Sequence, residues 1–197
     1  NKELKDNLLV NNNNFNGRKS LIIGGSRGIG SFVAKVLALL GSKVTISYFA
    51  CYEDALDVCK DINQNNAKEK ADLLKFDVLK DNFSDINNAS YDDLFYFATP
   101  KIFDKDSDAF SEEIYIQFKK VYADAFREIA LEFLEMGGKK IYYPSSVAVE
   151  QDIKGMEEYK MAKKDGELVC NDLNMRFPLK ILIDRLDRVN TDQTLSI

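Results

Sequence analysis

Short apolar runs alternate along this chain with longer stretches in which apolar residues recur at helical spacing. The short runs are rich in β-branched and aromatic residues and predict six strands: Leu21–Ile23, Lys43–Tyr48, Leu73–Val78, Leu94–Ala98, Lys140–Tyr143 and Leu179–Asp184. The longer stretches predict helices from a glycine-rich turn to Leu40 and over Glu53–Ile62, Ile114–Met136 and Met156–Leu173. Strands that alternate with helices in this way form a parallel sheet with helices on both faces.

Two of the predicted helices have an apolar face. The first helix is expected to bury Phe32, Val33, Val36, Leu37 and Leu40 and to end at Gly41. The long helix that Gly137-Gly138 ends is expected to cover the sheet with Ile114, Phe118, Val121, Ala125, Ile129 and Phe133.

A glycine-rich turn joins the first strand to the first helix. Gly24, Gly28 and Gly30 are spaced G-x-x-x-G-x-G, and Ser26, Arg27 and Ile29 lie between them. Glycines at such a turn let the backbone leave the strand sharply and approach a pyrophosphate, while the helix start presents amides and a positive dipole end. A glycine-rich turn alone is weak support for binding, but here it predicts an α/β, Rossmann-like, doubly wound parallel sheet that binds a dinucleotide.

Composition narrows the classes of function. The chain has 197 residues and a net charge of −5, with no basic tract, which argues against nucleic acid as a partner. The apolar runs are too short for a membrane span, and the three cysteines lack metal-ligand spacing, so we expect a cytoplasmic protein with no metal site. Residues 18–197 are expected to form a single domain, preceded by a linker or mobile arm at 1–17. Histidine is absent, so acid–base chemistry must fall to Tyr, Lys, Asp or Glu.

A second motif occurs near the start of the last predicted helix. Tyr159 and Lys163 form a Tyr-x-x-x-Lys pair, and Ser146 precedes Tyr159 by thirteen residues. Asp77-Val78 comes directly at the end of the third predicted strand. With these features in register with the glycine turn, the chain from Phe15 to Asp192 resembles the short-chain dehydrogenase/reductase family, and within it the ketoreductases of acyl-carrier-protein and polyketide type.

The resemblance implies roles for these residues. Tyr159 would exchange a proton with the substrate oxygen, and Ser146 would hold the carbonyl and share its developing charge. Lys163 would lower the Tyr159 pKa from its ordinary value near 10 and hydrogen-bond the nicotinamide ribose. Asp77 would meet the adenine amino group. Val189 and Thr191, in a V-x-T-D-like segment, would contact the nicotinamide amide.

Cofactor choice depends on the end of the second predicted strand. The stretch Ser47–Cys51 carries no acidic residue, whereas an acid there usually binds the ribose 2′-hydroxyl of NAD. Arg27 is a candidate partner for a 2′-phosphate, although it could equally be a solvated loop cation. We therefore expect NADP(H) rather than NAD(H).

Several positions depart from the family pattern. Phe97-Ala98-Thr99-Pro100 replaces Asn-Asn-Ala-Gly, and Leu186-Asp187 replaces Pro-Gly. The catalytic asparagine position falls near Gln117-Phe118, and no asparagine occurs from Ser111 to Met136.

Two classes of function therefore stand side by side. The first is an active oxidoreductase with a small-molecule or acyl-thioester carbonyl substrate; the second is a catalytically weak or inactive dinucleotide-binding or scaffolding domain of a larger assembly. A sugar-nucleotide epimerase or dehydratase shares Tyr-x-x-x-Lys but usually has a G-x-x-G-x-x-G turn. The resemblance also implies a possible homo-oligomer through the long helix.

Overall fold

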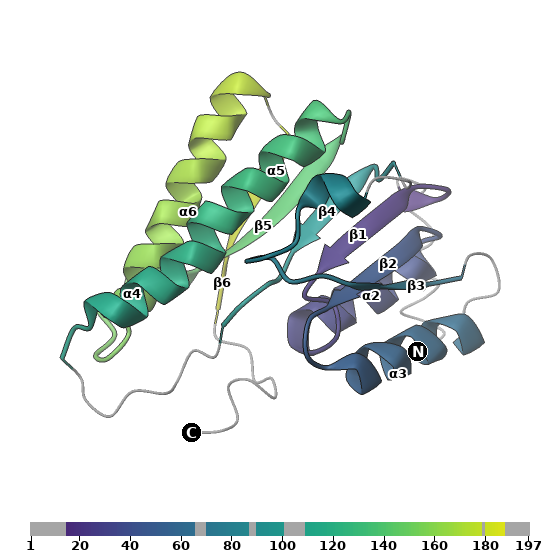
Figure 1. Cartoon of the computed structure of the whole chain (residues 1–197), viewed down its shortest axis with the longest axis horizontal. Coiled ribbons are helices and arrows are strands. Elements are labelled where there is room, and N and C mark those ends of the chain that lie inside the picture. The colour runs from purple at the N-terminus through teal and green to yellow at the C-terminus, as the bar shows by residue number, and fades with distance from the viewer. Residues whose placement is uncertain (1–14, 66–69, 87–89, 101–108, 179, 188–197) are drawn as a thin grey trace.

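The computed structural model describes residues 15–65, 70–86, 90–100, 109–178 and 180–187 and contains one parallel sheet. Its strand order is β3-β2-β1-β4-β5-β6, which confirms the predicted doubly wound α/β fold (Figure 1). The strands are β1 (Lys19–Ile23), β2 (Lys43–Tyr48), β3 (Asp72–Lys75), β4 (Asp93–Tyr96), β5 (Lys140–Ser146) and β6 (Ile181–Leu186). The chain moves outward from β1 to β3 and then crosses to β4, so the sheet reverses its winding between β1 and β4.

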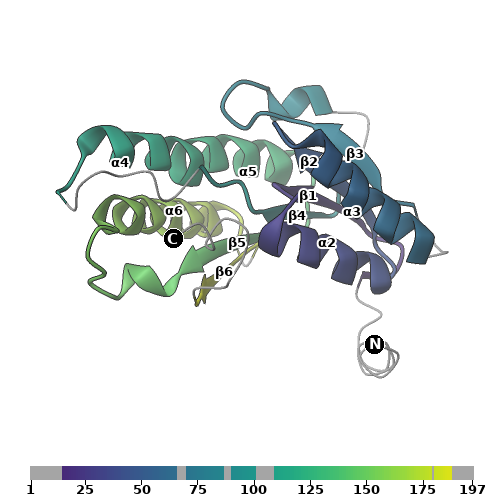
Figure 2. The same ribbon diagram turned by 90° about the horizontal axis from the view of Figure 1, so that it is seen from below.

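Helices cover both faces of the sheet. The helices α2 (Gly28–Leu39) and α3 (Tyr52–Asn65) pack on one face, and α6 (Glu157–Arg176) packs on the other beside a long helical rod. Figures 1 and 2 show these two groups of helices on either side of the strands. A short 3-10 turn, η2 (Phe83–Ile86), is the helical structure described between β3 and β4. None of the helices in the described ranges is long and apolar enough to cross a membrane.

The rod predicted as one helix over Ile114–Met136 has three parts. It begins as α4 (Glu112–Lys119), continues as a π-helical segment η3 (Lys120–Ala125) and ends as α5 (Phe126–Glu135). Of its predicted apolar face, Ile114 is half-buried and the other five side chains are buried. A π-helical turn inside an α-helix adds a residue and shifts the register of the residues that follow.

Two buried tyrosines bind the carbonyls of η3. The Tyr96 hydroxyl, from β4, donates to the Val121 carbonyl at 2.8 Å. The Tyr143 hydroxyl, from β5, donates to the Tyr122 carbonyl at 2.9 Å. Both tyrosines are 1% exposed or less, so these bonds supply buried partners for main-chain oxygens.

The prediction that Phe32 is buried was wrong. Its side chain is 64% exposed, while Gly30, Ala34 and Ala38 lie on the buried face of α2 together with Leu37. Small residues allow this helix to lie close to the sheet, so the face that packs is not the one with the largest apolar side chains.

Element boundaries differ from the predictions at several places. β5 continues to Ser146 and α6 continues to Arg176, whereas β3 ends at Lys75. Within the stretch assigned to the linker, Phe15 packs against Phe95 with ring centres 6.4 Å apart and the Gly17 amide donates to the Gly41 carbonyl at 3.0 Å. Gly41 follows α2 with a φ of 90°, as expected for a helix end.

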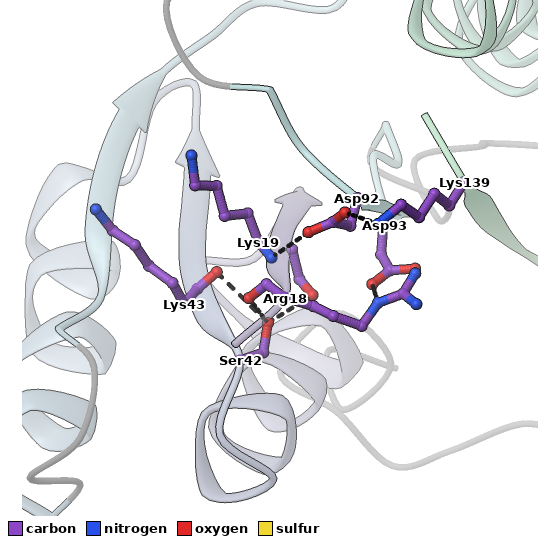
Figure 3. A network of polar contacts seen from close by, with 8 residues as sticks. Arg18, Lys19, Ser42, Lys43, Asp92, Asp93 and Lys139 are labelled. Atoms are coloured by element: carbon purple, nitrogen blue, oxygen red, sulfur yellow. Dashed lines mark hydrogen bonds and ion pairs between the residues drawn. The ribbon is translucent and has the colours of Figure 1, made fainter. Parts of the chain in front are cut away.

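The amino ends of the central strands carry a network of charges (Figure 3). Asp93, 3% exposed at the start of β4, accepts hydrogen bonds from the Arg18 guanidinium in a two-pronged pair, one of them from Nε at 2.6 Å. Beside it, the Asp92 carboxylate accepts from the Lys19 amide at 2.9 Å and pairs with Lys139 at 2.6 Å. The Asp92 pKa is lowered by these donors. This network ties β1 to β4 at the edge opposite their carboxyl ends.

We predict that Arg18→Met lowers the free energy of unfolding by about 2 to 3 kcal/mol, because it leaves the buried Asp93 carboxylate without its partner. Urea unfolding followed by circular dichroism measures this change. Lys43→Met is the control, since its 3.1 Å pair with Asp72 is exposed and should contribute less than about 1 kcal/mol. Equal losses in the two variants would contradict the assignment.

We predict that Gly166→Ala also destabilises the protein, although alanine favours helix over glycine. A Cβ at this α6 position would lie 1.9 Å from the Tyr143 hydroxyl and 2.7 Å from the Tyr122 carbonyl oxygen. We expect a loss of about 2 to 4 kcal/mol in unfolding free energy from the clash and the broken hydrogen bond. In a double-mutant cycle, Tyr143→Phe should recover part of this loss; purely additive losses would show that the two sites do not interact.

Candidate active site

A cavity of about 670 Å³ opens at the carboxyl ends of the strands, where the sheet reverses its winding. The glycine turn, the residues that follow β2, β3, β4 and β5, and side chains of η3 and α6 line it. Its size is that of a pocket for a substantial organic ligand. The cavity therefore brings together parts of the chain that are distant in sequence.

The glycine turn forms one wall of the cavity. Gly24 has a φ of 75°, and a Cβ there would lie 2.7 Å from the Phe97 carbonyl group. A Cβ at Gly30 would lie 2.3 Å from the Gly24 carbonyl oxygen, so both positions require glycine. Gly28 also has a positive φ, 55°. This cradle fits the predicted approach of a pyrophosphate to the backbone at the start of α2.

The other predicted residues of this wall are Ser26, Arg27 and Ile29, and all three line the cavity. Arg27 precedes the first turn of α2, and its Nε lies 3.5 Å from an Asp54 carboxylate oxygen on α3. Both side chains are about half exposed, so this ion pair is weak and exchangeable.

Asp77 and Val78 line the cavity after β3, as predicted. The Asp77 carboxylate accepts a hydrogen bond from the Leu79 amide at 3.0 Å and pairs with Lys80 at 3.4 Å. Both contacts lie within the loop that follows β3 and fix its local turn.

Ser146, Tyr159 and Lys163 line the same cavity from two elements. Ser146 is the last residue of β5, and Tyr159 and Lys163 lie one turn apart at the start of α6. The Ser146 hydroxyl hydrogen-bonds the Tyr159 phenol and accepts from the Ala148 amide at 3.2 Å. The neighbouring Ser145 instead donates to Glu167 at 2.5 Å. The predicted triad is thus brought together.

The electrostatics of the triad differ from the prediction. Burial raises the pKa of Tyr159, and the Ser146 hydrogen bond opposes that rise. The Lys163 ammonium is 5.8 Å from the centre of the Tyr159 ring and donates instead to the Pro144 carbonyl at 2.8 Å. The groups that shift the Tyr159 pKa in this structure are thus burial and Ser146, and not Lys163, because a lysine whose own pKa is lowered by burial is neutral at the pH where a phenol titrates.

Lys163 is itself unusual, with only 6% of its surface exposed. Burial lowers its pKa to about 7, and the Glu167 carboxylate acts in the opposite direction. A lysine in this environment changes its charge near neutral pH.

Sequence reasoning missed one residue of the site, Tyr122. It lies in η3, lines the cavity and places its ring 4.0 Å from the Lys163 ammonium. Gln117, considered as a substitute for the missing asparagine, is exposed and does not line the cavity. No motif or spacing in the sequence marks Tyr122 as a residue of the site. The predicted Val189 and Thr191 lie outside the described residues.

Comparisons with known proteins identify the fold. No protein-family model matches the chain, and no curated protein matches it in sequence. Among solved structures, it is similar to a short-chain dehydrogenase from Burkholderia cenocepacia J2315 in complex with NADP, with a TM-score of 0.76 and 22% identity over 91% of this chain and 77% of that one. A dehydrogenase/reductase from Sinorhizobium meliloti 1021 matches with a TM-score of 0.77 and 21% identity over 98% and 79%. An Escherichia coli oxidoreductase, yciK, matches with a TM-score of 0.76 and 16% identity over 89% and 78%. The chain therefore has the fold of the short-chain dehydrogenases.

Proposed function

We propose that this protein is an NADP(H)-dependent oxidoreductase that transfers a hydride between the nicotinamide and a carbonyl or alcohol substrate. The observation that carries this proposal is that Ser146, Tyr159 and Lys163 line the same cavity as the glycine turn. A cavity that only bound a dinucleotide would not need a serine–tyrosine–lysine group in its wall. The NADP-bound structure of similar fold supports the choice of cofactor.

Separate groups of residues in the cavity would bind the separate parts of a dinucleotide. Gly24, Ser26, Gly28, Ile29 and Gly30 would hold the pyrophosphate. Asp77 and Val78 would hold the adenine, and Lys163 would hold the ribose of the nicotinamide. The bound cofactor supplies the hydride, so the protein has to bind, orient and move a proton.

Tyr159 has the properties of a proton donor in this site. Its raised pKa keeps the phenol protonated at neutral pH, so that it can donate to the oxygen of a carbonyl as that oxygen gains charge. The Ser146 hydrogen bond favours the ionised form and would ease the loss of the proton. Ser146 would also bind the same substrate oxygen.

The cavity wall beside the triad indicates the class of substrate. Val121, Ile153 and Met156 line it, and they offer apolar contact rather than charge. A small ketone or the acyl part of a thioester would fit such a wall. We also propose that the protein forms a homo-oligomer through the long helix, as the resemblance implies.

We predict that Tyr159→Phe lowers the turnover of NADPH with β-keto thioesters or small ketones by about 100-fold or more, the usual contribution of general acid catalysis. NADPH oxidation followed by absorbance measures the rate. Tyr142→Phe is the matched control, because Tyr142 is half-buried on β5 but does not line the cavity.

Equal background rates in the wild type, Tyr159→Phe and the control would contradict an oxidoreductase for these substrates. Combined with tight NADPH binding, that result would favour the alternative of a non-catalytic dinucleotide-binding domain.

We predict that Arg27→Ala weakens NADPH binding by about tenfold and leaves NADH binding unchanged, because a charged hydrogen bond to the 2′-phosphate is worth about 1.5 kcal/mol or more. Asp54→Asn should have the opposite effect, since it removes the carboxylate that competes for Arg27. Titration calorimetry with both cofactors measures the four changes. Tighter binding of NADH than of NADPH by the wild type would overturn this cofactor preference.

A further inference from the structure

The Lys163 ammonium lies among three tyrosine rings. Its Nζ is 4.0 Å from the ring centre of Tyr122, 5.2 Å from that of Tyr143 and 5.8 Å from that of Tyr159. A cation within about 6 Å of an aromatic centre, over its face, is attracted by the ring quadrupole, and the attraction grows as water is excluded. The Tyr122 ring is the closest of the three.

The Tyr122 ring is held in a fixed orientation. Its hydroxyl forms a short hydrogen bond with the Thr99 hydroxyl, and because Thr99 donates to the Pro100 carbonyl at 3.1 Å, Tyr122 is the donor. The Tyr159 ring meets it edge to face, with centres 5.6 Å apart and an interplanar angle of 87°. Phe118 stacks against it at 6.0 Å. The side chain is 1% exposed and has no room to turn.

The backbone of Tyr122 is fixed as well. Its carbonyl accepts the Tyr143 hydroxyl, and the contact is possible because Gly166 has no side chain. The position of the ring over Lys163 is thus set from both the side chain and the main chain.

The charges that face Lys163 are few in the part of the chain that the structure describes. The Glu167 carboxylate, on the same helix, acts on it over a distance, the Cys170 thiol on that helix is uncharged because burial raises its pKa, and the three tyrosines face it from η3, β5 and α6. Within the described ranges Lys163 forms no ion pair, and its hydrogen bond goes to the neutral Pro144 carbonyl. A buried ammonium with this set of neighbours depends on ring faces and a carbonyl for its stabilisation.

We propose that Tyr122 is a positioning residue, whose ring face keeps Lys163 charged and in place beside Tyr159. The role of Tyr122 in the reaction rests on the proposed function, whereas the interaction between its ring and Lys163 does not. Tyr122 is not the proton donor, because burial raises its pKa well above the ordinary value and its proton is committed to Thr99. Without the ring, Lys163 would become neutral at lower pH and lose its hold on the cofactor ribose.

The test measures the protonation of Lys163 directly. Protein labelled with 15N-lysine is titrated, and the Lys163 Nζ resonance is assigned by its absence from Lys163→Met. The wild type should titrate near 7. Tyr122→Phe, which keeps the ring, should change the proton affinity less than about twofold, whereas Tyr122→Leu should lower it by about tenfold.

Two further variants distinguish an effect of the Tyr122 ring face on Lys163 from a general effect of core packing. Phe118→Leu removes a buried ring that stacks on Tyr122, but Lys163 lies over the rings of the three tyrosines and not over this one, so the Lys163 titration should not change. Replacing Tyr122 by 3,4,5-trifluorophenylalanine keeps the shape of a ring but removes its negative face, and it should lower the proton affinity as Tyr122→Leu does. This replacement also serves if Tyr122→Leu fails to fold.

An unchanged Lys163 titration in Tyr122→Leu and the fluorinated protein, or an equal loss in Phe118→Leu, would overturn the proposal. The titration needs no substrate, so it stands even if Tyr159→Phe shows that the protein is not an oxidoreductase. In an active enzyme, the pH above which kcat falls should also move down by about one pH unit in Tyr122→Leu, because Lys163 then loses its proton at lower pH.

Discussion

The contact between Gly166 and Tyr143 is the constraint on which the site depends. The Tyr143 hydroxyl occupies the space that a side chain at position 166 of α6 would fill. From there it donates to the Tyr122 carbonyl. One hydroxyl thus joins β5, α6 and η3, the three elements that carry Ser146, Lys163 and Tyr122. A shift of α6 away from the sheet would move Tyr159 and Lys163 away from Ser146 even with all three residues of the triad intact.

The π-helical segment η3 accepts the hydrogen bond that this contact makes possible. Its carbonyls at Val121 and Tyr122 accept hydroxyls from the sheet, so the rod is attached to β4 and β5 by hydrogen bonds as well as by apolar packing. The change in register lets Phe118 and Tyr122 face α6 while Ile129 and Phe133 still face the sheet. π-helical turns are often found at functional sites for this reason.

Sequence reasoning predicted those parts of the structure that regular geometry determines. The sheet, the glycine turn and the meeting of Ser146 with Tyr159 follow from strand and helix periods and from motif spacing. Phe32 was misplaced because periodicity ranks large apolar residues above the alanines that let α2 approach the sheet. Tyr122 was missed because its place depends on one extra residue in a helical turn, which no pattern of apolar residues reveals. The surroundings of Lys163 were missed because they depend on packing between elements.

The two edges of the sheet stabilise a buried charge in opposite ways. At the amino ends, the buried Asp93 carboxylate has a guanidinium partner of opposite charge. At the carboxyl ends, Lys163 has ring faces and a carbonyl, which attract a cation less strongly than a carboxylate would. Burial lowers its pKa to about 7, and in the described part of the chain no paired carboxylate restores the ordinary value. A lysine that is held in place yet only weakly bound to its proton suits a site in which a proton has to move, whereas a fixed ion pair suits the edge that only has to hold the strands together.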